Sequence, residues 1–313
     1  MRTTGYIFTS ILIALFAAPL TAQVNDTYVI AAAGNTAGLQ GTRWVTDFDL
    51  FNPQPYTLRV TLVFLPTGGE AGDTVKFDVF SNENFSIENV VGTVFGRVGT
   101  GSLLVATFPE DNPGVPDDFL ARSFLVSTRT YNNAPSGTFG QLVPGVWAGL
   151  LDFATDQISS VAHGITNDVS TTTGFRANVG AVNLGRTSVT LRVSVYDGEG
   201  NTLLNRAPFT IPPQGHVQDR LPATVFYGSV EFFLDDPTLD GVVFPYVSVI
   251  DNRSGDPVYR SPVLLADPAI LFKMAKEKME LGKRIDTEVA REVVRSTARD
   301  LGVVTLARSR SSS

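Results

Sequence analysis

Histidine is the side chain that most often acts as a general base, and this chain has two histidines, His163 and His216. His163 lies in a segment with the pattern of a β-strand, whereas His216 follows a Pro-Pro turn. There is no Gly-x-Ser-x-Gly segment that could present a serine nucleophile, and the absence of cysteine excludes a thiolate nucleophile and thiolate zinc sites. The sequence therefore predicts a protein that is not an enzyme and needs no cofactor. A hydrolase on a β-sandwich scaffold stays open as an alternative, because paired carboxylates cannot be excluded from spacing alone.

Metal binding has weak support in the pattern of acidic residues. No His-Glu-x-x-His segment is present, and we predict no metal site. The segment Asp197–Asn201 offers oxygen ligands, but Thr202 stands where a calcium loop requires glycine, so we interpret it as a hairpin turn. Weak calcium binding in the acidic segments 235–240 and 251–256 stays open.

A few polar and aromatic residues are candidates for ligand binding. Trp147 lies in an irregular segment, where an exposed indole could stack on a sugar, and a packed linker tryptophan is the alternative. By contrast, Trp44 begins a strand of core type and is expected to be buried. The remaining candidates occupy matching strand ends, where they either bind a ligand or only form turns: Tyr131, Asn132, Asp251, Asn252 and Arg253.

The elements that would position these residues are β-strands, and they occur twice. Alternating apolar residues fill 58–64 and again 189–195, at a constant offset of 131 (183 − 52 for the asparagines that precede each strand). Period-two alternation is typical of a strand with one buried face. The sequence predicts an all-β protein of two tandem immunoglobulin-like or jelly-roll sandwiches that arose by internal duplication, over 23–150 and 151–265. Two similar but independent sandwiches are the alternative.

The C-terminal region has helical rather than β character. Asp267 and Pro268 are typical of a helix start, and Asp286 could cap a second helix that ends near residues 301–302. We predict a helical appendage over 266–307 that packs on the second sandwich, followed by a disordered tail over 308–313. A docking or self-association element and a helix on a membrane surface are the alternatives.

The N-terminus indicates export. Arg2, the apolar run 11–18 and the small residues that end at Ala22 predict a signal peptide over 1–22, with a retained anchor as the alternative. We expect a periplasmic, cell-surface or extracellular protein with no transmembrane anchor after cleavage. The formal net charge of −7 argues against a nucleic acid partner, because phosphate binding requires a basic face.

Several short segments resemble an uncharacterised group of exported bacterial proteins with paired β-rich domains. They are Gly41–Trp44 with Asp47 and Phe51–Pro53, Ser127–Asn132 with Gly137–Gln141, and Val249–Asn252 with Gly255–Pro257. The resemblance covers residues 28–260 and implies export and architecture, but no activity. Together with the residues, it favours a non-catalytic structural or protein-binding module of the cell envelope or surface. A carbohydrate-binding module is the first alternative.

Overall fold

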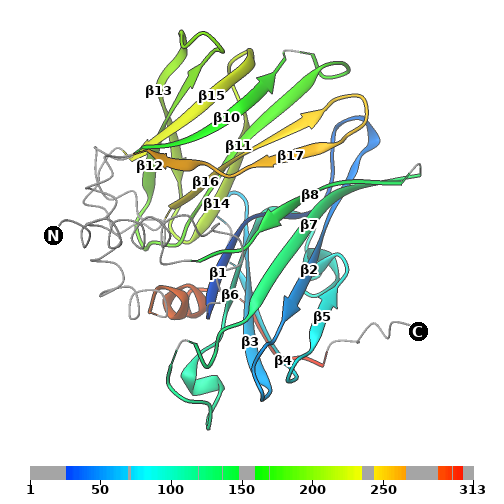
Figure 1. The fold of residues 1–313 in the computed structure, drawn as a ribbon, viewed down its shortest axis with the longest axis vertical. Coiled ribbons are helices and arrows are strands. Elements are labelled where there is room, and N and C mark those ends of the chain that lie inside the picture. Colours follow the sequence, from blue (N-terminus) through cyan, green and yellow to red (C-terminus); the bar gives the residue numbers. More distant parts are fainter. Residues whose placement is uncertain are drawn as a thin grey trace, which may run out of the picture.

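The computed structural model places two β-rich units one above the other (Figure 1). It describes residues 26–69, 72–118, 120–135, 137–147, 159–168, 170–234, 243–265, 288–297 and 299–305. The predicted signal peptide, the unit boundary near residue 150, the helix predicted from Asp267, the acidic segment 235–240 and the tail from 308 lie outside these ranges.

The described residues of the first unit form nine strands and three short helical turns. Its strands are β1 (Thr27–Ala37), β2 (Arg43–Phe51), β3 (Leu58–Pro66), β4 (Asp73–Val79), β5 (Asn84–Ile87), β6 (Gly99–Ala106), β7 (Leu125–Ala134), β8 (Gly137–Pro144) and β9 (Val146–Trp147). The turns are η1 (Leu39–Gly41), α2 (Val90–Thr93) and η2 (Pro109–Asp111). One layer has the order β4-β3-β6-β1-β9 and the other has the order β5-β2-β7-β8. The ends of β1 and β2 pair with each other and join the two layers into one continuous sheet.

The second unit is a sandwich of two separate sheets. Its strands are β10 (Ser159–Asn167), β11 (Phe175–Asn183), β12 (Val189–Tyr196), β13 (Thr202–Ile211), β14 (Gly215–Arg220), β15 (Val225–Leu234), β16 (Val243–Asp251), β17 (Pro257–Arg260) and β18 (Val263–Leu265). The five-stranded sheet has the order β13-β12-β15-β10-β18, and the four-stranded sheet has the order β14-β11-β16-β17.

The two units share one topology, as internal duplication predicts. Each strand of the first unit, from β1 to β9, corresponds in order to a strand from β10 to β18, and every pairing within the two layers recurs. A buried asparagine also recurs at the predicted offset. Asn52 accepts from the backbone N–H two residues ahead and donates to the carbonyl four residues ahead (2.9 and 2.9 Å), and Asn183 makes the same two bonds (2.8 and 2.8 Å). The prediction of an all-β protein of sandwich domains is therefore confirmed, and the shared topology is what an internal duplication would produce.

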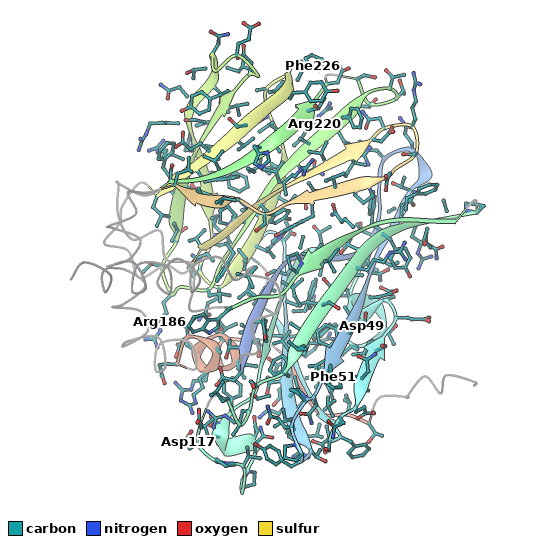
Figure 2. The ribbon with its side chains drawn as sticks, viewed as in Figure 1. Asp49, Phe51, Asp117, Arg186, Arg220 and Phe226 are labelled. Carbon is teal, nitrogen blue, oxygen red and sulfur yellow. The ribbon has the colours of Figure 1, made fainter. Side chains whose placement is uncertain are left out.

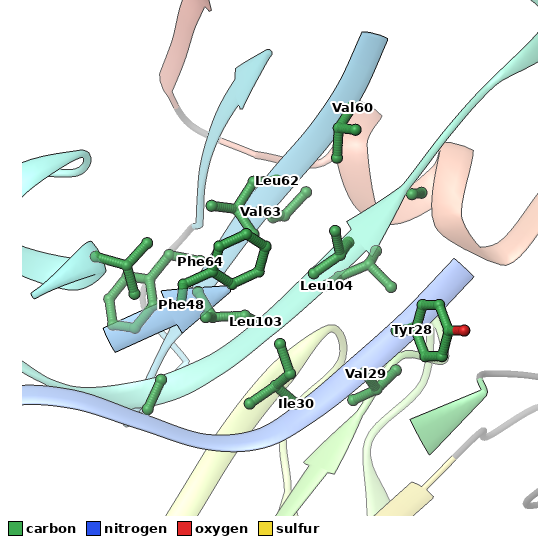
Figure 3. Packing of buried hydrophobic residues seen from close by; sticks show 14 of the residues in the cluster. Tyr28, Val29, Ile30, Phe48, Val60, Leu62, Val63, Phe64, Leu103 and Leu104 are labelled. Atoms are coloured by element: carbon green, nitrogen blue, oxygen red, sulfur yellow. The ribbon is translucent and has the colours of Figure 1, made fainter. Parts of the chain in front are cut away.

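One apolar core extends beyond the first unit. Figure 3 shows its centre, where Phe48, Leu62 and Phe64 pack together with Leu103. The same cluster includes Val182 and Phe244 from the second unit and Ala290 and Val293 from the C-terminal region: all four are buried. Strands β1, β3 and β6 are consequently buried on both faces over most of their length, rather than alternating between core and solvent.

The C-terminal region corrects the sequence prediction in two ways. The helix at 288–295 packs chiefly on the first unit rather than on the second, because its apolar stripe joins a core formed mostly by the first unit. Its exposed side is held by an ion pair from Arg291 to Glu110 (2.8 Å), while Arg186 of the second unit reaches Glu292 (2.9 Å; Figure 2). This helix thus contacts both units.

The second correction is that the helix does not continue to residue 301. Arg299–Val303 form strand β19, which pairs in parallel with β4 and satisfies the backbone at this edge of the sheet. Arg299 also binds Asp73 (2.9 Å), a fully buried carboxylate that Arg97 contacts from the other side (2.6 Å). Burial alone would raise the pKa of Asp73, but the hydrogen bonds from Arg97 and Arg299 outweigh it and hold this pKa below its usual value.

Candidate functional site

The candidate site lies where the four-stranded sheet of the second unit faces the first unit. Alternate residues of β11, β14 and β16 point away from the second unit's core, while their neighbours, such as Val179 and Val247, belong to that core. We call this outward surface the junction face. Its members are Arg176, Asn178, Gly180 and Val182 of β11, His216, Gln218 and Arg220 of β14, and Phe244, Tyr246, Ser248 and Ile250 of β16.

The chemical character of the junction face changes from one end to the other. At one end, Val182 and Phe244 are buried in the shared core. In the middle, His216 and Tyr246 are fully buried but polar. The other end carries two arginines and borders a cavity. The face is thus sealed against the first unit over part of its length and open over the rest.

A chain of hydrogen bonds crosses the sealed part. Thr67 of the first unit bonds Nδ1 of His216 through its hydroxyl (2.7 Å), and Nε2 of His216 bonds the hydroxyl of Tyr246 (2.9 Å). Tyr246 donates onward to Oε1 of Gln218 (2.8 Å). The backbone takes part too, since the N–H of Gly68 donates to the carbonyl of His216 (3.1 Å). Two of these bonds cross the junction, both to His216, so separating the units would take its Nδ1 and its carbonyl away from their partners Thr67 and Gly68.

Burial sets the protonation state of His216. It lowers the pKa of the imidazole to about 3, so the ring is neutral at physiological pH. A neutral imidazole has one donor and one acceptor nitrogen, which matches its two hydroxyl partners. His216 therefore joins the two units in this structure, while His163 is exposed on β10.

The cavity at the open end has a volume of about 360 Å³. Both units line it: Trp44, Thr130 and Gln141 come from the first, and Arg176, Asn178, Gln218, Arg220 and Ser248 come from the second. Its apolar wall is formed by alanines of β1 together with Ile250. None of the described residues that line the cavity is acidic. A cavity with a few polar groups at a domain junction is a common place for a ligand site.

The two arginines differ in how they are held. Arg176 is buried, and its Nη1 donates to Oδ1 of Asn252 (2.7 Å). Arg220 is exposed and donates to the backbone carbonyls of Asp168 and Ser170. Within the part of the chain that the structure describes, neither guanidinium pairs with a carboxylate. Burial, and then the positive charge of Arg220, lower the pKa of Arg176.

Polar contacts between the units border this cavity. Gln141 donates to Oγ of Ser248 (3.3 Å), and Gln40 donates to the carbonyl of Thr171. Trp44 is half-buried, and its indole N–H donates to the hydroxyl of Thr42 (3.1 Å). The expectation that Trp44 is buried is therefore wrong: Trp44 lies at the start of β2, beside the cavity instead of inside the sandwich core.

Two of the predicted site residues come together at the junction. Asn252 is buried and orients Arg176, and its own side chain is fixed by the carbonyls of Ser170 and Thr173 (3.1 and 3.0 Å). Asn132 is buried as well, and its side-chain nitrogen packs against Gly255 in the turn between β16 and β17.

None of the predicted site residues lines the cavity itself. Tyr131 is half-buried beneath Arg129 and bonds Asp47 (3.3 Å). Asp251 accepts a hydrogen bond from the backbone N–H of Arg253 (2.7 Å), as a turn-forming residue rather than a ligand contact would do. Arg253 itself is exposed. Trp147 lies in β9, where it pairs with Tyr28 of β1, and it is half-buried. This environment fits a packed tryptophan better than an exposed indole that stacks on a sugar.

The acidic turn at Asp197 is the hairpin that the sequence predicts. Oδ1 of Asp197 accepts from the backbone N–H groups of Glu199 and Asn201 (2.9 and 2.8 Å), between β12 and β13. The described residues contain no group of three or more histidine or acidic side chains placed to hold a metal ion. Nor does the described chain contain a helix long and apolar enough to cross a membrane.

Sequence reasoning did not find Arg176, Gln218, Arg220 and Tyr246. Their only signal was the polar half of an alternating strand, as in Arg176-Ala-Asn178-Val-Gly180, and that pattern predicts a solvent-facing side. Which polar strand face meets the other unit depends on how the two sandwiches stack, and the pattern of one strand does not encode this.

Comparisons with known proteins give only distant likenesses. No family model and no curated protein matches the chain, so the resemblance to an exported group stays a prediction. A solved protein from Parabacteroides distasonis ATCC 8503, described as secreted, is 10% identical with a TM-score of 0.21; the match covers 76% of this chain and 73% of that one. The BSP domain of a biofilm-associated protein is 7% identical with a TM-score of 0.19, over 78% and 59% of the two chains. Scores this low support no argument about function.

Proposed function

We propose that this protein is an exported, non-catalytic binding module whose ligand enters the cavity at the junction of the two β-units. The observation that carries the proposal is the division of the junction face into a sealed part and an open part. The sealed part holds the units together through apolar contacts and the His216 network. The open part leaves a polar cavity of about 360 Å³ with walls from both units. A rigid scaffold that presents a preformed cavity is typical of a binding protein.

The arrangement of the histidines supports a non-catalytic role. A general base needs a protonation change near the operating pH and access to a reacting group. His216 is buried between two hydroxyls with a pKa of about 3, so it meets neither condition. His163 lies on β10 in the other sheet of the second unit, away from the junction face.

Support for export comes from the composition of the chain. Residues 1–22 have the pattern of a signal peptide, and the body is acidic, which favours solubility outside the cell. The chain has no cysteine, and its folded body depends instead on a shared apolar core. We propose a place in the cell envelope or on the cell surface, with a partner of that compartment.

The test is binding of the purified chain without residues 1–22, carrying a fluorescent label, to intact cells and isolated envelopes of the bacterium that encodes it. We expect saturable binding that an excess of unlabelled protein displaces. Pretreatment of the envelopes with protease or with periodate shows whether the partner is a protein or a glycan. A linear, non-displaceable signal, or turnover of substrates in a broad hydrolase panel that Arg176→Gln abolishes, would contradict the proposal.

A further inference from the structure

We propose that the junction cavity takes a carboxylated sugar of the hexuronate class, with Arg176 and Arg220 binding its carboxylate. The inference rests on the proposed binding function and names the ligand class of the same cavity. It starts from two positive charges that the described part of the protein does not neutralise. Arg176 is buried, Arg220 lies close enough to act on it electrostatically, and neither has a carboxylate partner among the described residues.

A buried guanidinium without a counter-charge is costly to keep. Removal of a cation from water is offset only when an anion or several hydrogen bonds replace the lost hydration. Within the described structure, Arg176 makes one side-chain hydrogen bond, which it donates to the neutral amide of Asn252. A guanidinium has five N–H donors and matches a carboxylate with two parallel bonds. A bound carboxylate would supply the charge that Arg176 lacks.

The position of Arg176 is fixed before a ligand arrives. Asn252 accepts from Nη1 of Arg176 while its amide donates to two backbone carbonyls, so the guanidinium is held from behind by a locked side chain. Arg220 is tied to the carbonyl of Ser170 (3.3 Å), in the same loop that binds Asn252. Preorganised donors lose little conformational entropy on binding, which favours selective recognition.

The remainder of the cavity suits a sugar ring rather than a bare anion. Asn178, Gln218 and Gln141 offer amide groups that can both donate to and accept from sugar hydroxyls. Half-buried Trp44 and the alanines of β1 provide an apolar wall of the kind that contacts the C–H face of a sugar.

The charge of the whole chain argues against a large polyanion as the ligand. Its formal net charge is −7, so an extended phosphate polymer would be repelled outside the cavity. The two arginines form a local positive site inside an acidic protein. A single carboxylate on a small, hydroxyl-rich ligand fits this distribution of charge.

Isothermal titration calorimetry with the chain lacking residues 1–22 tests the inference. The probes are glucuronate and galacturonate, the neutral sugars glucose and galactose, and inorganic phosphate. We expect one hexuronate to bind with one site per chain, and at least tenfold more tightly than its neutral counterpart and phosphate. Arg176→Gln and Arg220→Gln should each weaken hexuronate binding by about 10- to 100-fold, which is the usual value of a charge-assisted hydrogen bond.

Arg253→Gln is the matched control, because it removes an exposed arginine near the same loop but outside the cavity. It should leave hexuronate affinity unchanged. Near-UV circular dichroism reports whether Arg176→Gln keeps the native packing, and Arg220→Gln changes an exposed side chain, so it provides a test that does not depend on a buried site. The inference is overturned if no hexuronate binds, if neutral sugars or phosphate bind equally well, or if Arg220→Gln matches the wild type.

This outcome can be separated from failure of the proposed function. If labelled protein binds envelopes saturably but Arg176→Gln and Arg220→Gln bind as well as the wild type, the binding module stands and the hexuronate cavity does not. If neither hexuronates nor envelopes are bound, both are wrong.

Discussion

Acidification from pH 6.5 to pH 4.5 is expected to lower the unfolding free energy of this protein by about 2–3 kcal/mol through His216 alone. The imidazole has a pKa of about 3 in the fold because it is buried, whereas an unfolded histidine has a pKa of 6.5. Between these values the unfolded chain binds a proton that the folded protein does not bind. The stability that depends on a neutral His216 is therefore complete above pH 6.5 and is lost progressively as the pH falls toward 3.

Urea unfolding at half-unit pH steps measures this effect, and two variants assign it. His216→Gln should be less stable than the wild type at pH 7, because the bonds to Thr67 and Tyr246 change, but its stability should depend much less on pH. His163→Gln removes the exposed histidine and should keep the wild-type pH dependence. The window stays above pH 4.5 so that Asp73, with its lowered pKa, contributes little, while Asp26, whose pKa is raised by burial, is present in both proteins and does not affect their comparison. Equal slopes for the wild type and His216→Gln would contradict this account.

Gly180→Val is expected to destabilise the protein by about 2–4 kcal/mol, because the structure leaves no room for a side chain at position 180. The ring of Tyr246 lies directly over Gly180, and a Cβ there would overlap the ring carbons and the hydroxyl. Tyr246 must then move, and it loses its bonds to His216 and Gln218. The cost combines overpacking with buried polar groups that lack partners.

Gly34→Ala is the matched control for this substitution. Gly34 also lies in a strand at the junction, but a Cβ there would meet its nearest atoms at 3.4 Å, an ordinary van der Waals contact. We expect the melting temperature of Gly34→Ala to stay within a few degrees of the wild type, while Gly180→Val melts well below both. A Gly180→Val protein as stable as Gly34→Ala would show that Tyr246 is not packed as described.

Much of the fold could be predicted from local patterns, because the strands of a sandwich can be recognised from alternating apolar residues and from the turn residues between them. The constant offset between the strands at 58–64 and 189–195 is the pattern that predicts a duplication. The preceding asparagines, Asn52 and Asn183, make the same hydrogen bonds in the structure. Strand lengths were harder to predict. Strand β5, for example, ends already at Ile87, and Asn89 then caps the short helix α2.

The C-terminal region was harder because its structure depends on distant partners. The sequence from Asp286 has the propensity of one helix, yet Arg299 leaves the helix to reach a buried carboxylate, Asp73, and to cover the free edge of β4. Tertiary contacts of this kind override local helix propensity. The same reasoning explains why the apolar stripe of the helix could be recognised but not assigned to the first unit.

The candidate site could be predicted only in part. Asn252 was identified from its place at a strand end, but as a turn residue or ligand contact rather than as the support of Arg176. The cavity itself arises from the stacking of two sandwiches, so its residues come from strands that are far apart in sequence. A single polar strand face looks the same whether it meets solvent or another domain.

The central claim is that the two β-units form one folded body, joined through the shared core and the His216 network, so that the cavity is a fixed feature. Differential scanning calorimetry of the chain without residues 1–22, at pH 7, tests this claim most directly. The account predicts one transition whose calorimetric enthalpy equals its van't Hoff enthalpy, because neither unit can keep its buried junction residues without the other. Two resolved transitions, one for each sandwich, would show that the units fold independently and would contradict the account.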